Sequence, residues 1–135
     1  MRTLLAVIVG FIAAFAVMMA CEFTNSRVFP FPKGMDTFDL AQVRAFAASL
    51  PASAYILLVT GWVVGSFVGG WISAKVAKTS AGTAAIAVGV LLTLGAGFNA
   101  WLIQNPWWIH FGGLPLFGLL VYAGYRVATA RADVA

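Results

Sequence analysis

Four long apolar stretches take up most of this chain of 135 residues. They run over residues 3–21, 52–74, 81–103 and 107–128, and none of them carries a charge in its middle. A helix crosses the hydrocarbon core of a bilayer, ~30 Å thick, with about 20 apolar residues. The chain is therefore expected to be an integral membrane protein whose fold is an all-α four-transmembrane-helix bundle.

The composition points to the same class of protein. Hydrophobic residues make up 62% of the chain and charged residues only 9%, whereas a soluble domain carries about 25% charged residues. The length allows a single integral membrane domain over residues 1–135, with the lipid bilayer as its main partner. The basic residues are scattered rather than clustered, so no nucleic acid partner is expected. The lone Cys21 excludes an intrachain disulfide.

The first apolar stretch is expected to remain as a membrane anchor, because it is longer than the roughly 7–15-residue apolar region of a cleaved signal peptide. Lys and Arg concentrate on the cytoplasmic side of membrane proteins. In a four-span topology one side holds Arg2, Lys75, Lys78, Arg126 and Arg131. The other side holds Arg27, Lys33 and Arg44, mixed with acidic residues. Both termini are therefore expected in the cytoplasm.

The long connection over residues 22–51 is predicted to form the first outer loop. Pro30 and Pro32 exclude a helix in its first half. Asp36 or Thr37 is suited to cap a helix, and the apolar residues that follow recur at helical spacing. This pattern predicts a short amphipathic helix over residues 37–50 that lies in the membrane interface.

The last apolar stretch is predicted to begin at a tight turn and to bend soon afterwards. Asn105 and Pro106 are expected to cap and open its helix. Pro115 lies close to several glycines, so a kink is expected in the outer half.

Small residues recur at multiples of four positions in two of the apolar stretches. The second stretch contains Gly61, Gly65 and Gly69, and the third contains Gly89 and Gly97. Small residues let helix backbones approach closely in lipid and gain dispersion contacts. These glycines therefore form either a dimerisation face or the contact between the second and third stretches of one chain. We favour the contact within the chain, because the short connection already brings these two helices together.

A polar cluster in the outer leaflet is predicted from Glu22, Asn99 and His110. Asn99 and His110 each lie ~6 Å from the turn that joins the last two stretches, so their side chains are expected side by side. Polar groups in hydrocarbon turn inward and find partners. The cluster is either a hydrogen-bonded latch, which we favour, or a site for a small ligand or a proton. Recognisable metal-ligand spacing is missing, so no metal site is expected.

The order of these features resembles a group of small four-span bacterial inner-membrane proteins to which no activity is assigned. The resemblance rests on the segment Pro-Phe-Pro-Lys-Gly-Met-Asp at residues 30–36, on Leu50-Pro51, and on Trp62 with Gly65, Gly69 and Gly70. It covers roughly the first half of the chain. It implies a bacterial source and the cytoplasmic membrane, and it brings no catalytic residues.

No arrangement of side chains typical of an enzyme is present in the sequence. His110 is the sole histidine, and no pair of carboxylates lies at mid-depth. We therefore expect a non-enzymatic structural or accessory protein without a cofactor, which assembles as a homo-oligomer or within a larger membrane complex. The alternative is a small oligomeric transporter or channel for a proton, a cation or a small molecule.

Overall fold

The computed structural model describes residues 1–104 and 106–130. Within the second range, it describes only the backbone of His110. Every regular element in these residues is a helix, so the all-α prediction is confirmed for them. The elements are α1 (Arg2–Val28), α2 (Leu40–Ser49), α3 (Ala52–Ala77), the 3-10 turn η1 (Lys78–Ser80), α4 (Ala81–Ile103), the π-helix η2 (Ile109–Gly113) and α5 (Leu114–Ala130).

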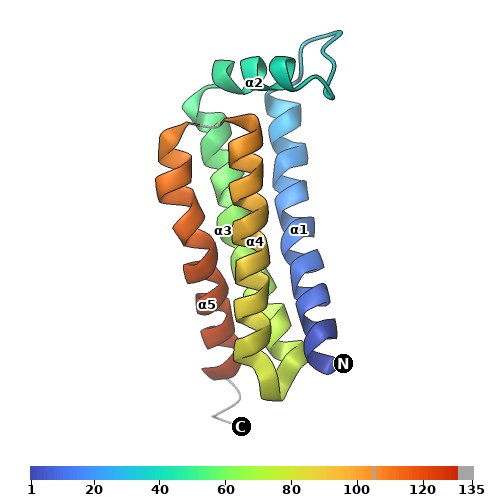
Figure 1. Ribbon diagram of the computed structural model, residues 1–135, viewed down its shortest axis with the longest axis vertical. Helices are drawn as coiled ribbons and strands as arrows, with labels where there is room; N and C mark the ends of the chain where they lie inside the picture. Colours follow the sequence, from blue (N-terminus) through green and yellow to red (C-terminus); the bar gives the residue numbers. More distant parts are fainter. Residues whose placement is uncertain (105, 131–135) are drawn as a thin grey trace.

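Three helical segments among the described residues are long and apolar enough to cross a membrane: Arg2–Val28, Ala52–Ile103 and Phe111–Ala130. The middle segment comprises α3 and α4, which fold back on each other at η1 (Figure 1). Lys78 makes this reversal possible with a positive φ of 55°. A helix satisfies its own backbone hydrogen bonds, which hydrocarbon cannot do. These segments are therefore consistent with a membrane protein.

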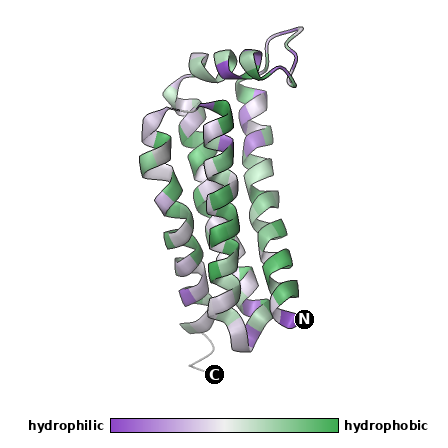
Figure 2. Ribbon diagram, in the orientation of Figure 1, coloured by the Kyte–Doolittle hydropathy of each residue, from purple (hydrophilic) through white to green (hydrophobic). Residues whose placement is uncertain are grey.

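The four long helices lie side by side, and α2 crosses one end of them (Figure 1). The N-terminus and the α3–α4 turn lie at the opposite end. The Arg2 Nε donates to the Val76 carbonyl at 3.0 Å, and the hydroxyls of Thr3 and Ser80 lie 2.7 Å apart. These bonds join the start of α1 to the α3–α4 turn. Figure 2 shows that the more hydrophilic residues gather mainly towards the two ends of the bundle.

Two helix boundaries differ from the sequence-based prediction. The first helix continues to Val28, seven residues beyond the expected end at Cys21, so Glu22 lies inside a helix. Nothing in this stretch breaks a helix until Pro30, which disfavours helical geometry at the residue before it. The outer helix α2 begins at Leu40 rather than Thr37, and its N-cap is Asp39, whose side chain accepts a hydrogen bond from the Ala41 N–H.

The part of the last stretch where a kink was predicted contains the π-helix Ile109–Gly113. It ends in Gly112 and Gly113, just before Pro115. A π turn shifts the backbone hydrogen bonds by one residue and is one of the recognised causes of a bend. The predicted cap at Asn105 lies outside the described residues. Pro51 is the N-cap of α3.

The core changes in character along the bundle. Towards the end that holds the N-terminus, the buried residues Ala6, Ala77 and Ala84 bring α1, α3 and α4 together. Nearer the middle, larger buried side chains fill the interior, chiefly Val88, Leu92, Phe117 and Val121. Small side chains therefore form the core near the N-terminus, and larger side chains form it nearer the middle.

Candidate functional site: a glycine-lined bundle with a cavity beneath α2

The glycine row of α3 faces α1. A Cβ built on Gly61 would lie 2.7 Å from the Cβ of Cys21, and one on Gly65 would lie 2.8 Å from the carbonyl oxygen of Ala14. A Cβ on Gly69 would lie 2.9 Å from the Cβ of Ala14. These distances leave no room for a side chain. The prediction that this glycine row packs against the third apolar stretch is therefore wrong. The row packs against α1, which presents its own small residues here.

A second face of α3 meets α5 equally closely. A Cβ on Gly70 would clash with the backbone carbonyl of Val121, and one on Gly124 would clash with the carbonyl of Phe67. Gly70 belongs to a small-residue row that the sequence makes visible, but Gly124 stands in a stretch without such a pattern. Thus α3 is the central helix, and it uses one glycine face for α1 and another for α5.

The glycines of α4 are less enclosed. A Cβ on Gly89 would meet Val121 at an ordinary 3.6 Å, and one on Gly97 would meet no atom within 4 Å. Between α4 and α5 runs a groove of about 510 Å³, here called the α4–α5 groove. Ala85, Gly89 and Thr93 of α4 and Gly118 of α5 line it. Gly118 is exposed, so this glycine-lined surface faces outward.

The structure brings Glu22 and Asn99 to one cavity of about 320 Å³, here called the α2 cavity. Its walls come from α1, α3 and α4, with Phe117 of α5. The side chain of His110, the third member of the predicted cluster, lies outside the described residues. Asn25 and Ser26 also line the cavity. The sequence analysis missed them, because it ended the first helix at Cys21.

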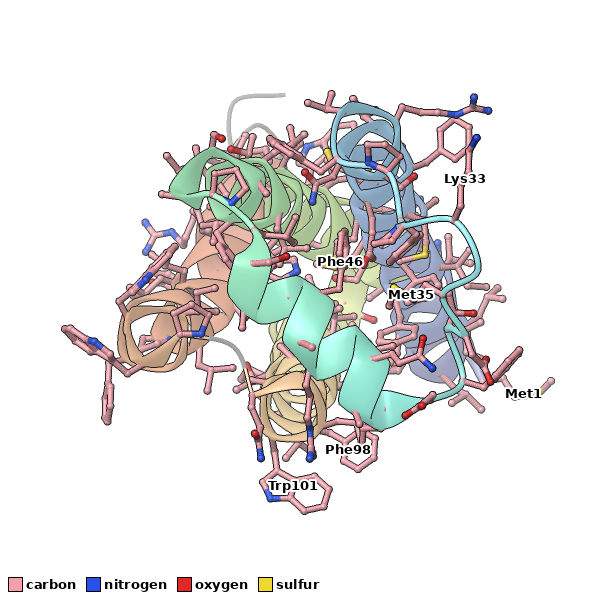
Figure 3. All side chains as sticks on the ribbon, turned by 90° about the horizontal axis from the view of Figure 1, so that it is seen from above. Met1, Lys33, Met35, Phe46, Phe98 and Trp101 are labelled. Carbon is pink, nitrogen blue, oxygen red and sulfur yellow. The ribbon has the colours of Figure 1, made fainter. Side chains whose placement is uncertain are left out.

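Helix α2 forms the roof of this cavity and is held to the bundle near its middle and at its end. The Arg44 Nε donates to the Leu102 carbonyl at the end of α4, at 2.9 Å. The Tyr55 hydroxyl donates to the Ala47 carbonyl at 2.5 Å. Figure 3, a view onto α2, shows this helix lying across the end of the bundle, with Phe46 over the interior. The Phe46 ring contacts that of Phe31, with 5.0 Å between centroids.

The α2 cavity is polar near its roof and apolar at depth. Glu22, Asn25, Ser26 and Asn99 lie towards α2, and Glu22 is the one charged side chain among the described lining residues. The Asn25 Oδ1 is buried and accepts no hydrogen bond from the described residues. Deeper in the cavity, aromatic side chains replace polar ones: Phe11, Phe15, Trp62 and Phe117. The Trp62 and Phe117 rings lie 5.4 Å apart and form its floor.

Two titratable side chains are found among the described lining residues of the α2 cavity. They are the Glu22 carboxylate and the Tyr55 hydroxyl, and the Tyr55 hydroxyl donates its hydrogen bond to the Ala47 carbonyl. Among the described residues, no group of three His, Cys, Asp or Glu side chains is placed to hold a metal ion. No protein-family model matches the chain, and neither a curated protein nor a solved structure was found to be significantly similar to it.

Proposed function

We propose that this protein is a four-span protein of a bacterial inner membrane, with both termini in the cytoplasm and α2 in the outer interface. The side-by-side arrangement of the four long helices supports this topology. The charge distribution also supports it, because Arg2, Lys75 and Lys78 fall at the end of the bundle away from α2, as the positive-inside rule requires.

Within this membrane the protein acts as a non-enzymatic structural or accessory component that assembles through helix contacts. The observation that carries this function is the α4–α5 groove. The glycine rows of α3 are already covered by α1 and α5, whereas Gly118 and the groove around it face outward. A small-residue surface lets a further helix approach closely in lipid. That helix belongs to a second copy of the chain or to a larger membrane complex.

The substitution Gly118→Leu tests this assembly, because Gly118 lines the groove and a Cβ added there meets no atom within 4 Å. We expect subunit counting by single-molecule photobleaching in lipid vesicles to show loss of the assembly. Crosslinking from the groove in native membranes, with identification of the product, tests assembly with another protein. The matched control is Gly97→Leu, which also adds a side chain to open space. If both methods find the wild-type protein alone, the proposal fails.

A second candidate function is transport by a small oligomer, and the α2 cavity favours it because the cavity reaches Glu22 and Asn99. Alanine packing of α1, α3 and α4 closes the bundle at its other end, so transport requires a further conformation or a path between subunits. Flux into liposomes that stops with Glu22→Gln and persists with Asp36→Asn would support this candidate. Flux that is absent from wild-type liposomes would exclude it.

A further inference from the structure

In the proposed topology the α2 cavity opens sideways between α1 and α4, on a side of the bundle that faces the lipid. Phe15 and Met19 of α1 and Leu91 of α4 line it, yet each of the three side chains is at least 40% exposed on the outside of the bundle. On the side towards the N-terminus, contacts among α1, α3 and α4 close the α2 cavity. Towards α2, Val43, Phe46 and Ala47 line it from above, and the Glu22 and Asn99 side chains at this end are exposed. A ligand therefore enters between α1 and α4, from the hydrocarbon.

The length and volume of the cavity suit a molecule with one chain. Eleven residues separate Phe11 from Glu22 on α1, which corresponds to ~16 Å along the helix. The volume of about 320 Å³ falls at the lower end of the range for small-molecule pockets, about 300–1,000 Å³. This volume favours a single apolar chain over the two chains of a bilayer phospholipid.

The polar end of the cavity determines which polar head group a bound single-chain molecule can carry. Glu22 supplies a carboxylate and Asn25 a buried amide oxygen without a described donor. A buried acceptor that lacks a donor is costly, and a carboxylate prefers a cationic donor to a neutral one. The Asn25 Oδ1 is enclosed by its surroundings, so the choice of head group rests on the Glu22 carboxylate, which favours an ammonium or amine and repels an anion.

We propose that the α2 cavity binds a single-chain amphiphile with an amine head, which enters from the bilayer between α1 and α4. Its ammonium group lies at Glu22 beneath α2, and its apolar chain extends towards Trp62 and Phe117. This inference does not depend on assembly through the α4–α5 groove. It uses the same cavity as the transport candidate, but it requires binding alone and no flux.

Quenching of Trp62 fluorescence by a long-chain ω-bromoalkylamine tests the proposal. The protein carries Phe at the other four tryptophans, which are Trp71, Trp101, Trp107 and Trp108, and is placed in nanodiscs of phosphatidylcholine. We expect saturable quenching by the amine, with a half-saturation about tenfold lower than for the matching ω-bromoalkanoate, as a charged hydrogen bond requires. A second protein that retains only Trp101, which is 69% exposed, reports unspecific quenching from the lipid.

Two pairs of variants locate the head and the chain. Glu22→Gln should remove the preference for the amine, whereas Asp36→Asn, which removes a carboxylate outside the cavity, should keep it. Gly95→Leu should block the chain, because Gly95 lines the cavity and has no atom within 4 Å of an added Cβ. Gly97 also has no atom within 4 Å of an added Cβ, but it is not one of the described residues that line the cavity. The Gly97→Leu variant should therefore bind the amine like wild type.

Three results would overturn the proposal: quenching of Trp62 that does not saturate and matches that of Trp101, equal affinity for the amine and the alkanoate, or wild-type affinity in Gly95→Leu. Near-ultraviolet circular dichroism shows whether each variant is folded. If Gly95→Leu does not fold, the Glu22→Gln and Asp36→Asn pair decides the outcome by itself.

Discussion

Glycines at different positions have very different surroundings in this bundle. Gly70 lies directly against the backbone of α5, whereas Gly97 on α4 meets no atom within 4 Å. Sequence spacing makes both visible as small residues, but it does not reveal which helix faces them. That information depends on how the helices are rotated about their axes, and in lipid this rotation is set by close packing rather than by burial of an apolar face.

We expect Gly70→Ala to lower the free energy of unfolding by about 1–3 kcal/mol, because the added Cβ must displace the Val121 carbonyl. Gly97→Ala is the control and should be neutral or stabilising by up to ~1 kcal/mol, because Ala is the better helix former. Reversible unfolding of the purified protein in mixed micelles measures both values. Equal stability of the two variants would contradict the close contact between α3 and α5.

At the scale of the element, two hydrogen bonds hold α2 to the bundle. Their donors are the side chains of Arg44 and Tyr55, and both acceptors are backbone carbonyls. Helical periodicity predicts that this segment is a helix. The sequence does not predict that Arg44 and Tyr55 hold it, because their acceptors, Leu102 and Ala47, are backbone atoms and carry no residue signature. The cap was predicted at Asp36 or Thr37 and lies at Asp39, because Asp and Thr both cap helices well and the sequence does not decide among the three positions.

Tyr55→Phe removes the hydroxyl that donates to Ala47 while keeping the ring. A hydrogen bond of this kind contributes about 0.5–1.5 kcal/mol, so amide exchange in α2 should become about 2- to 10-fold faster. Hydrogen exchange with mass spectrometry measures this rate. Thr60→Val is the matched control, because the Thr60 hydroxyl bonds only to Ile56 of its own helix. It should leave exchange in α2 unchanged, and an unchanged rate in Tyr55→Phe would contradict the role of this bond.

The start of α2 should also respond to acid. The Asp39 carboxylate accepts hydrogen bonds from the Gln42 side chain and from the Ala41 N–H, and these bonds hold the pKa of Asp39 below its ordinary value of 3.8. The ionised carboxylate therefore stabilises the helix start above pH 3.8, and this contribution is lost as the pH falls through the lowered pKa. NMR titration of the carboxyl carbon should give a value below 3.8. A midpoint at or above that value would show that the cap is absent.

At the scale of the whole molecule, the apolar stretches predict the helices well, because each stretch is long and uninterrupted. The α2 cavity could not be predicted in full. Glu22 and Asn99 were placed at one level from their depth, but Asn25 and Ser26 belong to a helical extension that has ordinary polar composition. Hydropathy marks where apolar residues end, whereas this helix continues until proline geometry stops it.

The proposed topology predicts opposite accessibility for the two ends of the bundle. In a Cys21→Ala background, a membrane-impermeant maleimide added to intact bacterial cells should label Asp36→Cys and spare Lys78→Cys. Both variants should react after the membrane is permeabilised, which controls for buried thiols. Labelling of Lys78→Cys in intact cells would invert the proposed orientation.

The contacts of α1 have a consequence for biogenesis. Its glycine-lined partner surface is supplied by α3, and its first residues bond to Val76 and Ser80. During synthesis, α1 therefore emerges long before the residues that complete its environment. In the proposed topology, its small-residue face therefore stays uncovered until the α3–α4 hairpin has been inserted.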